Sequence, residues 1–187
     1  MSSWLRWLPS LLSVSRVFFT PPIASAILND RFPHAFLLCW IAGGTDFLDG
    51  WLARRYGWES RTGAWLDAIS DKILLSTIYV CFALTGDVWG WLVALVLGRD
   101  VMILMLAAAG ILFTPIRDFP PSIWGKISTN IQIAAAAAVL AGPPWLKPWA
   151  LALCGIGTAC SGLHYFVSAV QKWRMLPSGV TNPAKPD

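Results

Sequence analysis

Residues 46–71 read DFLDGWLARRYGWESRTGAWLDAISD and place four aspartates at regular spacing in an otherwise apolar part of the chain. On a helix, successive residues turn by about 100°, so a polar stripe can be read directly from the spacing. Five residues of this stretch share one arc of about 140° on a helix: Asp46, Asp49, Gly50, Ala53 and Arg54. The sequence therefore predicts a helix with one face of carboxylates, small residues and a single arginine.

A second polar stripe follows after a short basic loop. Gly63, Asp67 and Asp71 recur at i, i+4 and i+8, a spacing that drifts by only about 80° around a helix. A short loop between two helices makes them antiparallel neighbours. We therefore expect the two stripes to face each other and to bring the four carboxylates together.

Four carboxylates in one region of low dielectric cannot all remain ionised without a compensating charge. Divalent cations provide that charge, and hard oxygen ligands select Mg²⁺ or Mn²⁺. Gly50, Ala53 and Gly63 carry no bulk over the stripes, so a ligand can approach the backbone, and Arg54 can reach a phosphate. The alternative is that the carboxylates only form ion pairs with Lys72, Arg99 or Lys126, which the regular spacing disfavours.

The composition indicates a membrane protein. Hydrophobic residues make up 56% of the 187 residues and charged residues 13%, against about 25% in an ordinary soluble domain. Six apolar stretches have about the length needed to cross a bilayer. They lie near residues 10–28, 35–54, 64–85, 89–113, 122–141 and 147–171. We therefore predict an all-α, six-span transmembrane domain over residues 1–172, followed by a disordered tail over 173–187.

The distribution of basic residues predicts the orientation. With six spans, the side that holds both termini carries Arg6, Arg54, Arg55, Arg61, Arg117, Lys172, Arg174 and Lys185. The other side carries only Arg31 and Lys147. The positive-inside rule therefore places the termini and the carboxylates on the cytoplasmic side. The basic residues form no arm or patch, so no nucleic-acid partner is expected.

Residues Asp46 to Asp71 match every fixed position of D-x2-D-G-x2-A-R-x8-G-x3-D-x3-D. On these residues the chain resembles the CDP-alcohol phosphotransferase family. The resemblance implies a six-helix membrane fold, a homodimer and a cavity open to the cytoplasmic side. It also implies that the protein lies in a bacterial inner membrane or a mitochondrial inner membrane, with its active site facing the cytoplasm or the matrix.

The resemblance also implies roles for the residues of the motif. Asp46, Asp49 and Asp67 would bind two divalent cations, and Asp71 would act as general base and also contact metal. The CDP group would be bound by Gly50, Ala53, Arg54 and Gly63. The resemblance further implies transfer of a phosphatidyl group from CDP-diacylglycerol to an alcohol. Ser70 lies next to Asp71 but points about 100° away from it, so no obvious nucleophile is present and direct transfer is the simplest scheme.

The acceptor is less clearly indicated. The stretch 98–102, GRDVM, is similar to cardiolipin synthases, and Ser128 stands where phosphatidylglycerolphosphate synthases usually carry a second lysine. Phosphatidylglycerol is therefore the expected acceptor, with glycerol 3-phosphate as the alternative. Arg16, Arg99 and Lys126 are candidate ligands for the phosphates, although an internal pair such as Arg99 with Asp100 remains open.

A function of another class is a divalent-cation transporter that uses the same carboxylates. Transporter sites tend to lie near the midplane between repeated halves. Here the carboxylates lie at one face, and the second half of the chain has no matching stripe. The sequence therefore favours an enzyme.

Overall fold

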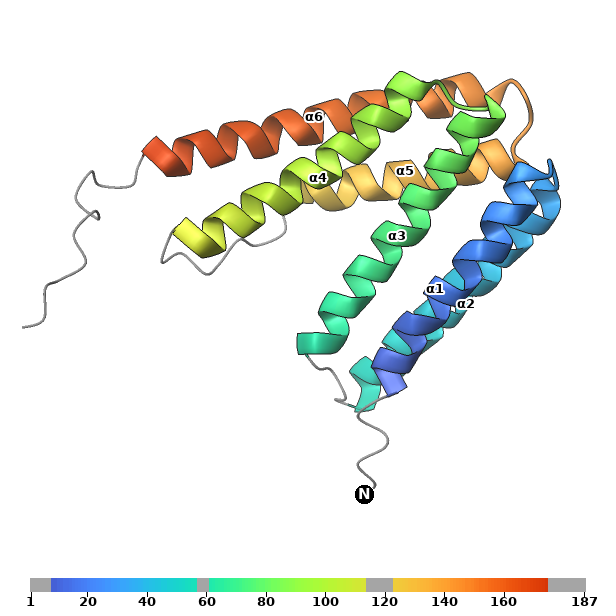
Figure 1. The fold of residues 1–187 in the computed structure, drawn as a ribbon, viewed down its shortest axis with the longest axis horizontal. Helices are drawn as coiled ribbons and strands as arrows, with labels where there is room; N and C mark the ends of the chain where they lie inside the picture. Colours follow the sequence, from blue (N-terminus) through green and yellow to red (C-terminus); the bar gives the residue numbers. More distant parts are fainter. Residues whose placement is uncertain (1–7, 57–60, 114–122, 175–187) are drawn as a thin grey trace, which may run out of the picture.

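The described part of the chain forms six α-helices. The computed structural model describes residues 8–56, 61–113 and 123–174. The helices are α1 (Leu8–Leu28), α2 (Phe32–Tyr56), α3 (Arg61–Thr85), α4 (Gly90–Phe113), α5 (Ile123–Ala141) and α6 (Leu146–Arg174) (Figure 1). Each predicted span coincides with one of these helices, with ends that agree to within about three residues. The predicted tail lies almost entirely outside the described residues.

The helices form two groups. In the first, α1 packs against both α2 and α3; in the second, α6 packs against α4 and α5. Figure 1 shows these groups as two arms that diverge from a common end. We call α1–α3 the first arm, α4–α6 the second arm, and their meeting point the closed end.

Three tight turns lie at the closed end. They join α1 to α2, α3 to α4, and α5 to α6 (Figure 1). Asp30 in the first turn has φ 57°, and Gly86 in the second has φ 81°, which glycine adopts without steric cost. Lys147 at the start of α6 lies 3.1 Å from Asp87 Oδ1 and 5.5 Å from the Phe32 ring centroid. Lys147 therefore ties α6 to the other two turns.

The apolar core joins the two arms near this end. Its largest fully buried apolar side chains come from α1, α3 and α4: Ile23, Ile27, Tyr79, Phe82, Leu92 and Val96. The Tyr79 hydroxyl donates to the Gln132 carbonyl at 2.9 Å and lies 3.3 Å from Cys154 Sγ. A side chain of α3 thus contacts both α5 and α6, which holds the arms together where they meet.

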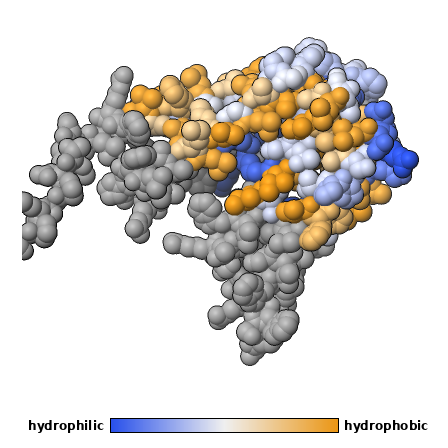
Figure 2. Space-filling view, viewed as in Figure 1, coloured by the Kyte–Doolittle hydropathy of each residue, from blue (hydrophilic) through white to orange (hydrophobic). Residues whose placement is uncertain are grey.

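The outside of the helices is strongly apolar. Large side chains on α6 are exposed, among them Trp149, Leu153, Ile156, Leu163 and Phe166. Figure 2 shows hydrophobic residues over much of one face, with hydrophilic residues at the closed end and in the hollow between the arms. By length and composition, one stretch of the described residues could cross a membrane, Leu146–Gln171 in α6, and Arg16–Leu28 is a shorter apolar stretch. The six helices are confirmed, whereas six crossings and their orientation remain predictions.

Candidate active site

The predicted carboxylates lie on the parts of α2 and α3 that are far from the closed end. Asp46 and Asp49 belong to the second half of α2, and Asp67 and Asp71 to the first half of α3. Tyr56 and Arg61, which end α2 and begin α3, are five positions apart and therefore at most about 18 Å from each other. The backbone thus places both halves of the motif at the same end of the first arm.

Most side chains of the motif lie outside the part of the structure that is described. They are those of Asp46, Asp49, Gly50, Ala53, Arg54, Gly63 and Asp67. Their predicted roles in binding metal and CDP therefore stay predictions. Among the described side chains, which include only Asp71 of the four aspartates, no three His, Cys, Asp or Glu residues are grouped so that they could hold a metal ion.

The first arm adds a helix to the predicted pair. In the described residues, α1 packs against both α2 and α3, and the described parts of α2 and α3 do not pack against each other. A short loop indicates contact only between the two helices that it joins, whereas the packing of α1 against both depends on the tertiary fold. The facing of the two stripes near residues 57–60 remains a prediction.

Asp71 is held by α1. The guanidinium of Arg16 donates a hydrogen bond to Asp71 Oδ1 and forms an ion pair with it. The Arg16 side chain is 4% exposed, whereas that of Asp71 is 56% exposed. Arg16, a predicted phosphate ligand, is therefore next to the predicted base. The signal in the sequence was the arginine itself, because a buried cation in an apolar helix needs a partner.

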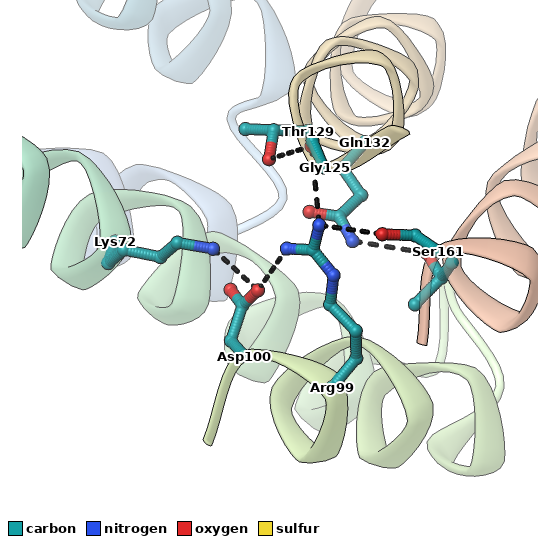
Figure 3. A network of polar contacts seen from close by, with 8 residues as sticks. Lys72, Arg99, Asp100, Gly125, Thr129, Gln132 and Ser161 are labelled. Carbon is teal, nitrogen blue, oxygen red and sulfur yellow. Dashed lines mark hydrogen bonds and ion pairs between the residues drawn. The ribbon is translucent and has the colours of Figure 1, made fainter. Parts of the chain in front are cut away.

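Arg99 lies in a buried polar network of the second arm (Figure 3). Its Nη1 donates to Asp100 Oδ1 at 2.6 Å, and its Nη2 donates to the Gly125 carbonyl at 3.2 Å and to Ser161 Oγ at 2.9 Å. The guanidinium also lies 5.9 Å from the ring centroid of Tyr165. The internal pair with Asp100, left open by the sequence, is thus present.

Lys72 extends this network to the first arm. Its Nζ lies 2.5 Å from Asp100 Oδ1, so one carboxylate oxygen of α4 contacts both Lys72 of α3 and Arg99 (Figure 3). From the sequence, Lys72 is a possible partner of the motif carboxylates. Its contact with Asp100 depends on how α3 and α4 pack, which the sequence alone does not give.

Lys126 is not brought into this network. It lies on α5 and is exposed, with no ion pair among the described residues. Ser128 is fully buried, and its Oγ has no hydrogen-bond partner among the described atoms. Of the three candidate phosphate ligands, the structure therefore connects Arg16 to the predicted base and Arg99 to Lys72, and leaves Lys126 apart.

The fold and the motif together define a family. The family model for CDP-alcohol phosphatidyltransferases matches residues 6–167, from before α1 into α6. The chain belongs to this family.

Two curated relatives connect the chain to cardiolipin synthases. A Drosophila melanogaster protein named as a probable cardiolipin synthase (CMP-forming) is 29% identical over 194 residues, which cover 90% of this chain and 59% of the relative. A Schizosaccharomyces pombe protein named as a fusion of cardiolipin synthase (CMP-forming) with a mitochondrial hydrolase is 35% identical over 184 residues, covering 86% of this chain and 31% of the relative. The chain thus spans only part of these proteins.

A third relative is named for the other activity that the sequence left open. The CDP-diacylglycerol–glycerol-3-phosphate 3-phosphatidyltransferase of Aquifex aeolicus is 32% identical over 125 residues, covering 65% of this chain and 68% of the relative. Relatives named as cardiolipin synthases and a relative named as a glycerol-3-phosphate 3-phosphatidyltransferase are therefore both similar to this chain.

Proposed function

We propose that the protein is an integral membrane phosphatidyltransferase that moves a phosphatidyl group from CDP-diacylglycerol to an alcohol and releases CMP. The observation that carries the proposal is the complete family motif on α2 and α3, which ends in an accessible Asp71 carboxylate held by a buried arginine. In this proposal all six helices cross the membrane, and the termini and the site face the cytoplasm or the matrix. From the family resemblance, we also propose that the protein forms a homodimer.

The residues present suit divalent cations. The donor set consists of carboxylate oxygens, which hard cations such as Mg²⁺ and Mn²⁺ prefer. Asp46, Asp49, Asp67 and Asp71 would hold two such ions. When bound, the ions would neutralise charge on the diphosphate of the donor.

The chemical step needs a base for the acceptor hydroxyl. The Asp71 carboxylate accepts the hydroxyl proton, the hydroxyl oxygen forms a bond to the phosphorus that carries the diacylglycerol, and the bond from that phosphorus to CMP breaks. Arg16 keeps the carboxylate in place through its hydrogen bond to Oδ1. Gly50, Ala53, Arg54 and Gly63 would accommodate the CDP group.

Phosphatidylglycerol is the proposed acceptor, which makes the protein a cardiolipin synthase. Both terminal nitrogens of Arg99 already donate to protein oxygens, and Ser128 supplies no charge. Among the described cations of the second arm, Lys126 alone has no ion pair, which favours an acceptor without the phosphomonoester dianion that glycerol 3-phosphate carries and phosphatidylglycerol lacks. Glycerol 3-phosphate is the second candidate because the Aquifex aeolicus relative is named for it.

The test is to offer the purified protein CDP-diacylglycerol with phosphatidylglycerol, glycerol 3-phosphate, serine or inositol in turn. We expect CMP release and cardiolipin formation with phosphatidylglycerol, and loss of both when the divalent cation is chelated. If phosphatidylglycerolphosphate is the main product, the acceptor is glycerol 3-phosphate and the proposal of phosphatidylglycerol is wrong. Cation flux into vesicles without CMP release under any condition would indicate the transporter instead.

A further inference from the structure

Two consecutive residues of α3 contact two different helices. Asp71 pairs with Arg16 of α1, and Lys72 pairs with Asp100 of α4. Neighbouring side chains on a helix point about 100° apart, so these contacts lie on different sides of α3. Together they fix the rotation of α3 at the turn that carries the predicted base.

The contact between Lys72 and Asp100, which we call the cross-arm pair, joins the first arm to the second. Lys72 lies thirteen residues before the end of α3, and Asp100 lies ten residues after the start of α4. At 1.5 Å per residue, the cross-arm pair is about 15–20 Å from the closed end. It therefore links the arms well away from the turns, in the direction in which they diverge (Figure 1).

The Asp100 side chain is 8% exposed and that of Lys72 is 35% exposed. A buried carboxylate is costly unless charged partners surround it, and Asp100 has two, Lys72 and Arg99. Arg99 is in turn held by Gly125 and Ser161 (Figure 3). Within the second arm, Asp100 is thus held by Arg99. Its contact with the first arm is Lys72.

We infer that Lys72 and Asp100 are positioning residues, which set the distance between the carboxylates of the first arm and the residues of the second arm that face the acceptor. This inference rests on the proposed function. The motif proposed to bind the donor lies wholly on α2 and α3, so donor binding needs only the first arm. In the proposed function the acceptor contacts both arms, because the candidate phosphate ligands Arg99 and Lys126 lie on the second arm, so its binding and reaction depend on their spacing.

The sharpest variant is Lys72→Met, because it removes the cross-arm pair and leaves Asp100 with Arg99 as its partner. We expect kcat/KM for the acceptor to fall about 10²-fold, as it does when a reacting group is misplaced by about 1 Å. The acceptor KM should rise while the donor KM stays unchanged, a split that a smaller folded fraction would not produce. Lys72→Arg, which keeps charge and reach, should restore most of the activity.

Asp100→Asn provides the second half of a double-mutant cycle. It should show the same split, and the double variant should be no worse than the poorer single variant, because both changes remove one interaction. Strict additivity of the two losses would mean that Lys72 contacts the substrate independently of Asp100, which contradicts the inference.

The matched control is Asp87→Asn. It breaks the ion pair with Lys147 at the closed end and should lower the melting temperature without changing the acceptor KM. If Lys72→Met and Asp100→Asn behave like this control, the cross-arm pair has only a stabilising role and the inference is wrong.

A measurement without turnover separates this inference from the proposed function. Hydrogen exchange should accelerate in Lys72→Met around residues 69–76 and 97–104 and stay unchanged at the closed end. Faster exchange there in a protein that releases no CMP with any acceptor would refute the proposed function alone. Unchanged exchange would overturn the link between the arms whatever the activity.

Discussion

At the scale of single residues, two buried arginines organise the polar contacts. Arg16 and Arg99 are both nearly inaccessible, and each has a carboxylate partner, Asp71 or Asp100. A cation inside an apolar helix is costly, so its partner has to be fixed by the fold. Arg16 thus holds the predicted base, while Arg99 holds the carboxylate that Lys72 contacts.

The role of Asp71 can be tested by Asp71→Asn. The amide cannot accept a proton, so transfer should fall at least about 10²-fold, while CDP-diacylglycerol still binds. CMP release and donor binding by the same preparation would measure the two effects separately. Near-normal turnover in saturating divalent cation would refute the assignment of Asp71 as base.

These contacts also show which parts of the site can be read from a sequence. The motif from Asp46 to Asp71 is local, so its spacing predicts both the chemistry and the helices that carry it. The pair of Arg99 with Asp100 stays open in the sequence, because neighbours on a helix point about 100° apart and adjacency alone does not predict a contact. The pairs of Arg16 with Asp71 and of Lys72 with Asp100 depend on how helices are rotated and packed, which periodicity does not determine.

At the scale of elements, α5 and α6 approach each other closely beside Arg99. A Cβ built on Gly125 would lie 2.5 Å from the Tyr165 hydroxyl, so only glycine fits without a shift. The Gly125 carbonyl accepts from Arg99, and the Tyr165 ring lies beside the same guanidinium. The spacing of α5 and α6 therefore determines where Arg99 is held.

Gly125→Ala should push the Tyr165 hydroxyl aside and destabilise the protein by about 1 kcal/mol, the low end of the cost of overpacking, because the end of a half-buried side chain moves rather than backbone. Gly98→Ala is the matched control, because it lies one residue before Arg99 and its Cβ would meet nothing within 4 Å. Removing a helical glycine there should stabilise the protein by about 0.5–1 kcal/mol. Thermal unfolding in detergent would measure both changes, and equal shifts for the two variants would contradict the close approach of Tyr165.

At the scale of the whole molecule, the helices are joined by tight turns at one end and diverge toward the other (Figure 1). The helices could be predicted because the apolar stretches are bounded by turn-forming residues. The division into two arms could not, because it depends on which apolar faces pack together, and these helices are apolar on most sides. The exposed apolar surface of α6 agrees with a lipid environment.

The proposed topology places the three tight turns on the side opposite Arg55 and the C-terminus. Single cysteines introduced at Asn29, Asp87 and Trp145 in a cysteine-free background should react with an impermeant maleimide from the periplasmic or intermembrane side. A cysteine at Arg55 should react only from the other side. Labelling of both groups from one side would rule out the six-span arrangement.

In the proposed topology, where α1 and α3 both cross the membrane, the ion pair of Arg16 with Asp71 has a consequence for how the chain is inserted during synthesis. The two residues are separated by 55 positions, so α1 leaves the ribosome well before its counter-charge on α3 exists. At about 5–20 residues per second, the delay is on the order of 3–11 seconds. An arginine near the centre of a spanning helix raises the free energy of insertion by about 2.5–3.5 kcal/mol. The first helix should therefore stay at the translocon until the third arrives, and partition into lipid together with it.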